Sequence, residues 1–322
     1  MKIWAKCWRR TNNMSLRIRL TLTLTLCLAN FYVAADQTER PYLYVLGVAQ
    51  DAGYPQAGCY QQHCMPGWVD AKRELGATAL ALVDPKTRKT YLFEATPHLP
   101  RQLYRLEQQA GGYALSGVFL THAHIGHYAG LMFFGHEAMG ASNIPVFAMP
   151  RMADYLSSNG PWSQLVAFNN IILQPLAHNR TETLSGLGVT PFLVPHRDEF
   201  SETVGYSIKG PAKTALFIPD INKWSVWEKD IAEVIKTVDY ALLDATFFGD
   251  GELPGRDMSK VPHPLVTETM EALAALGPEQ REKVWFIHMN HTNPLLNPES
   301  TEALMVRAAG YNIATQSTRL DL

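Results

Sequence analysis

The sequence predicts an α/β fold, because short apolar runs typical of buried strands alternate with segments of helical pattern. The apolar runs at residues 144–148 and 214–218, for example, precede helical patterns at residues 151–157 and 226–236. The chain has 322 residues, of which 47% are hydrophobic, so it can bury a sizeable core in one large domain or two. Its aromatic, glycine and proline contents are those of an ordinary globular enzyme.

The first 35 residues differ in composition from the rest and predict a secretory signal peptide. Six basic residues precede the apolar run at 20–28, and a small-residue stretch suited to cleavage after Ala35 follows. An uncleaved membrane anchor is the alternative, although the run is short for a span and is diluted by threonine. We therefore expect a periplasmic or secreted protein with no stable membrane span in its mature chain, which is one domain at residues 36–322.

The charge balance of the mature chain argues against long nucleic acids as partners. Without the six basic residues of the N-terminal segment, Lys plus Arg falls from 28 to 22 against 30 Asp plus Glu, a net charge of about −8. No basic patch remains that would follow phosphates over many nucleotides. A small-molecule substrate fits this composition better.

The mature chain begins with a strand and a cysteine-containing loop. A strand pattern at residues 41–46 leads into a glycine-rich segment at 47–53, after which Cys59, His63 and Cys64 follow. An oxidising compartment favours a Cys59–Cys64 disulfide. The alternatives are a structural metal held by both cysteines and His63 or another ligand, and two unpaired thiols.

Strand and helix patterns continue through the rest of the chain. Residues 77–83 and 90–93 are expected to form a hairpin around a polar turn, and residues 204–208 and 214–218 another. A helix is expected near 100–109, and further helices at 265–276 and 298–309. Residues 283–287 form the last clear inner strand.

His122, His124 and His127 form a dense group of potential metal ligands. An apolar strand at 117–120 precedes them, and a helix start follows from residue 128. His122 and His124 share a face if the strand extends through them, and His127 would return over the turn. Three converging imidazoles suit a divalent transition metal, whereas three polar residues on a solvated loop are the alternative.

Residues 121–127 resemble the H-x-H-x-D-H motif of the metallo-β-lactamase superfamily. This resemblance, which covers most of the mature chain by motif order, implies an αββα sandwich. In that fold two mixed β-sheets pack face to face, helices cover both outer faces, and a metal site lies at one edge. One position departs from the motif, since its aspartate is Gly126 here.

The resemblance also implies three later ligands, each at the end of an apolar strand, namely His196, Asp220 and His288. One ion would be held by His122, His124 and His196, and a second by His127, Asp220 and His288. Asp220 would bridge the two ions. Because Gly126 cannot coordinate through a side chain, the second site is weak, completed by water, empty, or completed by a carboxylate from elsewhere in the chain.

Three stretches narrow the resemblance to the coenzyme PQQ biosynthesis protein B branch of the superfamily. Residues 46–56 with the two following cysteines, and residues 286–294, resemble the two ends of that branch. The strand at 239–243 ends in Asp244-Ala-Thr, a step that resembles the same branch and phosphodiesterase-like proteins. Asp244 would then support a metal ligand or the substrate, and a capping role is the alternative.

The expected metal is zinc, as one or two ions, and iron or manganese fit the same ligand types. A divalent ion lowers the pKa of bound water towards neutrality. Asp220 would orient that water and accept its proton, and His263 or His291 would protonate a leaving group. His263 lies in a long loop at 249–264, where a rigid surface position is the alternative.

Three functions are compatible with these residues. The first is a secreted metal-dependent hydrolase of a small ester, amide, lactone or phosphodiester. The second, implied by the resemblance, is an oxidative or carrier role in cofactor biosynthesis, and the third is a non-catalytic metal- or ligand-binding module. We expect the hydrolase, because cofactor assembly belongs in the cytoplasm and a signal peptide would direct the protein out of it.

Overall fold

The structure is a computed structural model that describes residues 40–322, of which 41–322 form one compact unit. The predicted signal peptide at residues 1–35 lies outside the described residues. Within the described range, no helix is both long and apolar enough to cross a bilayer.

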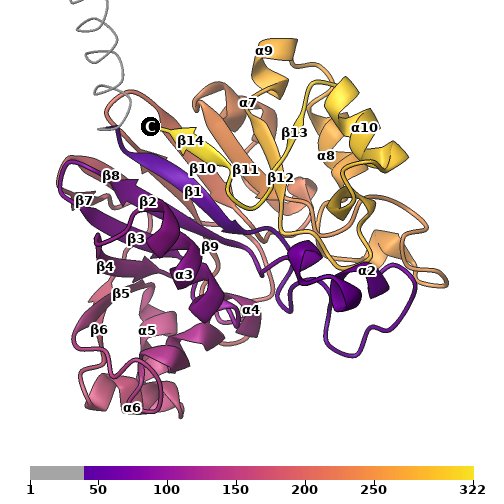
Figure 1. Cartoon of the computed structure of the whole chain (residues 1–322). Coiled ribbons are helices and arrows are strands. Elements are labelled where there is room, and N and C mark those ends of the chain that lie inside the picture. The colour runs from indigo at the N-terminus through magenta and orange to yellow at the C-terminus, as the bar shows by residue number, and fades with distance from the viewer. Residues whose placement is uncertain (1–39) are drawn as a thin grey trace, which may run out of the picture. The chain divides into compact units, whose positions relative to one another are not determined.

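Two mixed sheets, each of seven strands within the described residues, form the centre of this unit (Figure 1). The first has the order β14 (Arg319–Asp321), β1 (Tyr42–Gly47), β2 (Ala79–Asp84), β3 (Lys89–Phe93), β4 (Ala114–Phe119), β5 (Ile144–Ala148) and β6 (Ile171–Pro175). The second has the order β13 (Asn312–Ile313), β12 (Val284–Ile287), β11 (Tyr240–Asp244), β10 (Thr214–Ile218), β9 (Val204–Lys209), β8 (Leu187–Leu193) and β7 (Glu182–Leu184).

Helices cover the outer face of each sheet, which confirms the predicted αββα sandwich (Figure 1). The first sheet packs against α3 (Leu99–Gln109), α5 (Pro150–Ser158) and α6 (Trp162–Ala167). The second packs against α7 (Ile231–Lys236), α8 (Val266–Ala272) and α10 (Thr301–Ala308). The short helices α2 (Met65–Val69), α4 (Ile125–Tyr128) and α9 (Pro278–Arg281) lie in connections.

Strand β1 shows why the sheets are apolar on both faces. All six of its residues are buried, and successive side chains point to opposite faces. Leu43 and Val45 belong to the core between the sheets, whereas Tyr42, Tyr44 and Leu46 belong to the core beneath the helices. The strand therefore reads as a continuous apolar run, as expected for a strand covered on both sides.

An aromatic cluster joins the two sheets next to the histidine-rich segment. Phe93 stacks on Phe119 with ring centroids 5.2 Å apart, and Tyr206 from the second sheet meets Phe93 edge-on at 5.3 Å. The Tyr206 hydroxyl donates a hydrogen bond to the carbonyl oxygen of Leu120, 2.5 Å away. This contact ties the second sheet to the chain just before His122.

Both predicted hairpins are present as antiparallel pairs, β2 with β3 and β9 with β10. The helix predicted over 226–236 is shorter, because α7 begins only at Ile231. The Asp230 side chain caps it by accepting a hydrogen bond from the Ala232 backbone N–H, and Trp227 before it is buried.

Candidate metal centre

Strand ends from both sheets meet at one edge of the sandwich and carry the predicted ligands. β4 leads into His122 and His124, and α4 carries His127. In the second sheet β10, β11 and β12 run parallel, so their carboxyl ends lie at the same edge. The residues at or just beyond the strand ends of the second sheet are His196, Asp220, Asp244 and His288.

His122, His124, His196 and Asp220 form the first group of the centre, and their ligand atoms all lie within 4.8 Å of one another. Asp220 Oδ2 is 3.2 Å from His196 Nε2 and 3.4 Å from His122 Nε2. His124 faces the same oxygen with Nδ1, at 4.0 Å. Three imidazoles around one carboxylate oxygen match the donors and the number of ligands that zinc prefers.

Asp51, His127 and His288 form the second group. His127 Nε2 is 3.1 Å from Asp51 Oδ1, and His288 Nε2 is 3.5 Å from the same oxygen. His127 Nε2 is also 3.8 Å from Asp220 Oδ2, so Asp220 lies between the two groups. We call these seven residues the His/Asp centre. Asp51, in the loop after β1, is the member that the sequence did not single out.

Polar side chains outside the centre hold three of its rings. The pairs are His122 Nδ1 with Thr121 Oγ1 at 2.8 Å, His288 Nδ1 with Thr246 Oγ1 at 2.9 Å, and His127 Nδ1 with Glu94 Oε1 at 3.2 Å. Each pair leaves the Nε2 atom of the ring facing inward. Such outer partners are typical of histidines that bind metals, because they fix both the tautomer and the ring orientation.

Two residues of this arrangement have strained backbones. Glu94 has a φ of 78° and His288 a φ of 67°. For residues with side chains this left-handed region costs on the order of 1–3 kcal/mol, and such strain clusters at functional sites. Glu94 was not predicted from the sequence, although it directly follows the apolar strand at 90–93.

His263 and Asp244 support Asp220 from the side. His263 Nδ1 donates a hydrogen bond to Asp244 Oδ2 at 2.9 Å and lies 3.1 Å from Asp220 Oδ1. Burial alone would lower the pKa of His263, but the charges of Asp244 and Asp220 raise it to about 10. Asp244 also accepts hydrogen bonds from the backbone N–H groups of Ile221 and Thr246. Asp244 therefore caps the turn and also contacts His263 beside the centre, so its position is compatible with both alternatives.

The surroundings of Asp220 and His122 favour the forms of these two residues that bind metal ions. Burial would raise the pKa of Asp220, but His263, His196 and His122 hold it well below its usual range. Burial, followed by the nearby charge of His127, holds the pKa of His122 well below its usual range. A carboxylate and a neutral imidazole are the forms in which these residues act as metal ligands.

Four buried ring nitrogens of the centre lack a hydrogen-bond partner, namely both nitrogens of His196, His127 Nδ1 and His288 Nε2. Buried polar atoms are normally paired, because an unpaired one costs free energy. Of these atoms, His196 Nε2 lies 3.2 Å from a carboxylate oxygen of Asp220, and His288 Nε2 lies 3.5 Å from one of Asp51. A cation held between these nitrogens and oxygens would satisfy them, so the residues present fit a metal.

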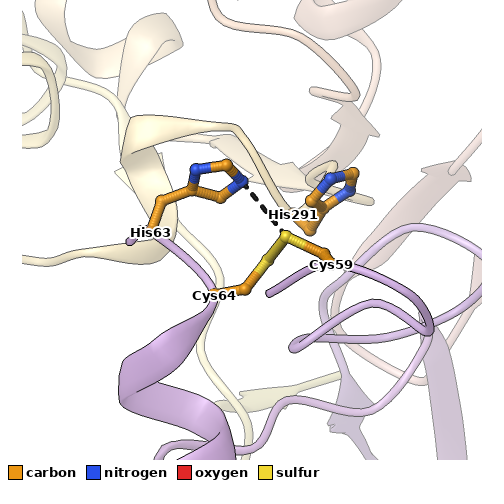
Figure 2. A group of neighbouring side chains, drawn as sticks. All are labelled: Cys59, His63, Cys64 and His291. Carbon is orange, nitrogen blue, oxygen red and sulfur yellow. Dashed lines mark hydrogen bonds between the residues drawn. A yellow bond between two sulfur atoms is a disulfide. The ribbon is translucent and has the colours of Figure 1, made fainter. Parts of the chain in front are cut away.

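A second cluster, which we call the cysteine cluster, consists of Cys59, His63, Cys64 and His291 (Figure 2). Of the three alternatives, the structure has the Cys59–Cys64 disulfide. His63 Nε2 lies 3.4 Å from Cys59 Sγ, and the His63 and His291 ring centroids are 5.6 Å apart. His291, expected as a proton donor at the metal, therefore lies in this cluster and in neither group of the His/Asp centre.

A cavity of about 460 Å³ opens beside the His/Asp centre. His263 and His291 line it together with Phe247 and two arginines, Arg197 and Arg256. Arg197 Nη2 is 3.4 Å from His124 Nε2, so one residue of the cavity wall contacts the first group of the centre. Guanidinium groups in such a wall favour a substrate with a carboxylate or phosphate.

Comparison with known proteins places this fold and centre in a family. The family model of the beta-lactamase superfamily domain matches residues 82–289, more than half of the 322 residues. The chain belongs to the metallo-β-lactamase superfamily. The matched range contains six of the seven residues of the centre and leaves out Asp51.

Relatives within the superfamily confirm the predicted branch. Coenzyme PQQ synthesis protein B (PqqB) of Xanthomonas oryzae pv. oryzae is 25% identical over 305 residues, which cover 87% of this chain and 99% of the relative. The protein of the same description from Methylorubrum extorquens is 25% identical over 306 residues, covering 87% and 100%. These relatives favour the cofactor-biosynthesis alternative over the secreted hydrolase.

Solved structures agree with this placement. The crystal structure of Zn(2+)-bound PqqB from Methylobacterium extorquens has a TM-score of 0.73 and 26% identity, covering 87% of this chain and 100% of that one. A diphosphatase from the PhnP family has a TM-score of 0.60 at 19% identity, covering 88% and 98%. The second likeness is one of fold alone.

The expectation of a periplasmic or secreted protein is wrong. It depended on the composition of residues 1–35, which lie outside the described residues. The relatives that match 87% of the chain are coenzyme-synthesis proteins, and assembly of such a cofactor is cytoplasmic work. The apolar run at 20–28 was therefore given too much weight.

Proposed function

We propose that this chain is a metal-dependent enzyme of the PqqB branch that acts on a small, negatively charged precursor in coenzyme synthesis. The observation that carries the proposal is the buried His/Asp centre in a chain that matches 99–100% of the length of PqqB relatives. The cavity with Arg197 and Arg256 beside the centre supports an anionic substrate.

Zinc is the proposed metal, because nitrogen and oxygen donors at these spacings suit it and a related PqqB is Zn(2+)-bound. His122, His124 and His196 would hold one ion, His127 and His288 would hold a second, and Asp220 would lie between them. When bound, such an ion polarises a substrate oxygen and lowers the pKa of water.

The protein side chains then have separate tasks. Asp220, kept ionised by the surrounding histidines, would hold the metal and orient a reacting water. His263 holds its Nδ1 proton between Asp220 and Asp244 and so fixes the Asp220 carboxylate. His291 stands on the cavity wall and can donate a proton to the substrate away from the metal.

Hydrolysis of a small ester, amide, lactone or phosphodiester is the second candidate. It is favoured by the position of Asp220 Oδ2, within 3.8 Å of histidines from both groups. Pairs of ions held around a shared carboxylate commonly serve to position water for attack.

Complementation separates the two candidates. The full chain is added to an extract that contains the other components of coenzyme PQQ synthesis but lacks PqqB, and coenzyme formation is measured beside the His196→Ala variant. Restoration by the wild type alone supports the proposal. If the wild type restores nothing but hydrolyses members of an ester, lactone and phosphodiester panel in a His196-dependent manner, the second candidate replaces it.

A further inference from the structure

Gly126 stands where the superfamily motif has an aspartate, and the structure shows what fills the space of the missing side chain. A Cβ atom built on Gly126 would lie 2.3 Å from Asp51 Cα and 2.5 Å from Asp51 Oδ1, so it would overlap both the backbone and the side chain of residue 51. Cβ atoms in real structures do not approach other atoms this closely, so residue 126 cannot carry a side chain while Asp51 is in place. The two positions exclude each other sterically.

Asp51 is held in this place by the strand end that carries His288. The backbone N–H of Gln50 donates to the Met289 carbonyl oxygen at 2.8 Å, and the N–H of Met289 donates to the Val48 carbonyl oxygen at 2.9 Å. A turn closed by the Gly53 N–H and the Gln50 carbonyl oxygen then presents Asp51. The loop after β1 is thus fixed one residue away from His288.

The Asp51 carboxylate points at the second group of the centre. Its Oδ1 atom is 3.1 Å from His127 Nε2 and 3.5 Å from His288 Nε2, and the side chain is 31% exposed. His288 Nε2 has no hydrogen-bond partner, and its Nδ1 is already bound to Thr246. One carboxylate and two imidazoles, each ring anchored from outside, therefore face one another.

We propose that Asp51 supplies, from a different part of the chain, the carboxylate ligand that the motif aspartate would have supplied, and that Gly126 is the change that makes room for it. The second metal position is therefore complete in this protein and not degenerate. This inference uses the metal centre of the proposed function, but it concerns metal binding and does not depend on the substrate.

Metal stoichiometry under non-reducing conditions, where Cys59 and Cys64 stay paired, tests the inference. The full chain is loaded with zinc, passed over a desalting column and analysed for bound metal, and affinity is measured by competition with a chelator. Asp51→Asn keeps the size of the side chain and removes its charge. We expect it to lose one zinc equivalent, with an affinity at that position reduced by about 100-fold or more, beyond the loss of an outer partner.

The control is Glu233→Gln, which alters an exposed carboxylate paired with Lys236 outside the centre and should leave the count unchanged. Gly126→Asp should lower the melting temperature through the clash with residue 51. Because the shortest contact is to the Asp51 Cα atom, Asp51→Gly/Gly126→Asp should not relieve this clash. Asp51→Asn protein with an unchanged zinc count and affinity would overturn the inference.

This result is separable from the fate of the proposed function. A chain that loses one zinc with Asp51→Asn yet neither restores coenzyme synthesis nor hydrolyses any substrate supports the ligand exchange and removes the proposed activity. If the wild type is active and Asp51→Asn binds zinc as the wild type does, only the proposal that Asp51 replaces the motif aspartate is overturned.

Discussion

The His/Asp centre and the cysteine cluster are both groups of potential metal ligands, and they share the segment from His288 to His291. In the centre, polar side chains contact three rings from outside, and four buried ring nitrogens are left without a hydrogen bond. In the cysteine cluster the two sulfurs are bonded to each other, and His63 is exposed. A bound cation would pair the buried nitrogens of the centre, whereas the sulfur atoms of the cysteine cluster are already joined in a disulfide.

This difference shows that proximity of ligands alone does not identify a metal site. The cysteine cluster is one group of four potential ligands, and the His/Asp centre consists of one group of four and one of three. Within each group the ligand atoms lie within 4.8 Å of one another. What distinguishes the centre is the cost of leaving its donors unpaired in a buried place, about 1–3 kcal/mol for each group. We therefore expect the centre to depend on metal and the cluster to depend on redox conditions.

Removing the Asp220 charge should have the largest effect on the centre. Asp220→Asn keeps the shape of the side chain but leaves the surrounding histidines without their shared carboxylate. We expect zinc content to fall at both positions and coenzyme formation to drop by about 10³-fold, equivalent to several kcal/mol of lost stabilisation. Asp198→Asn, at an exposed carboxylate paired with Arg151, is the control and should behave as the wild type. Unchanged zinc content in Asp220→Asn would contradict the role of Asp220 in metal binding and would remove the difference drawn between the centre and the cysteine cluster.

Loosening one ring anchor should have an intermediate effect. Thr246 Oγ1 hydrogen-bonds His288 Nδ1 and donates to Asp244 Oδ1, so Thr246→Val removes both hydrogen bonds. We expect zinc affinity to weaken by about 10- to 100-fold, as loss of an outer partner usually causes. Thr237→Val, on an exposed hydroxyl that bonds a helix carbonyl, should leave zinc affinity unchanged. Equal affinities in the two variants would contradict the role given to the anchors.

Breaking the disulfide should have the smallest effect on the centre. Cys59 and Cys64 are five residues apart, so Cys59→Ser/Cys64→Ser should lower the free energy of unfolding by about 2 kcal/mol, as loop-closure entropy predicts. Zinc in the His/Asp centre should not change. Chemical denaturation and metal analysis of the variant check both points. If instead the reduced wild type binds one zinc more than the variant, the cysteine cluster is itself a metal site.

Much of the centre was predictable because its ligands follow apolar strands. His196, Asp220 and His288 each come directly after such a run, and parallel strands bring their carboxyl ends to one edge. The αββα fold followed from the resemblance of residues 121–127 to a known motif. Strand periodicity and motif order were thus enough to place these side chains near one another.

The rest depended on tertiary packing that the sequence does not display. Asp51 lies 75 residues before Gly126 and reaches its place through backbone hydrogen bonds to Met289. Glu94 contacts His127 from a backbone position with a φ of 78°. His291 is only three residues after His288, yet it turns towards His63 and away from both groups of the centre. The one available signal for Asp51 was the missing carboxylate at Gly126, for which a replacement carboxylate was one of several alternatives.

Anomalous X-ray diffraction at the zinc edge, on crystals of the zinc-loaded chain, tests the central claim most directly. We predict one peak among His122, His124, His196 and Asp220 and a second among Asp51, His127 and His288, each about 2.0–2.2 Å from its ligand atoms. Full anomalous occupancy at the cysteine cluster with no peak in the His/Asp centre would contradict the account.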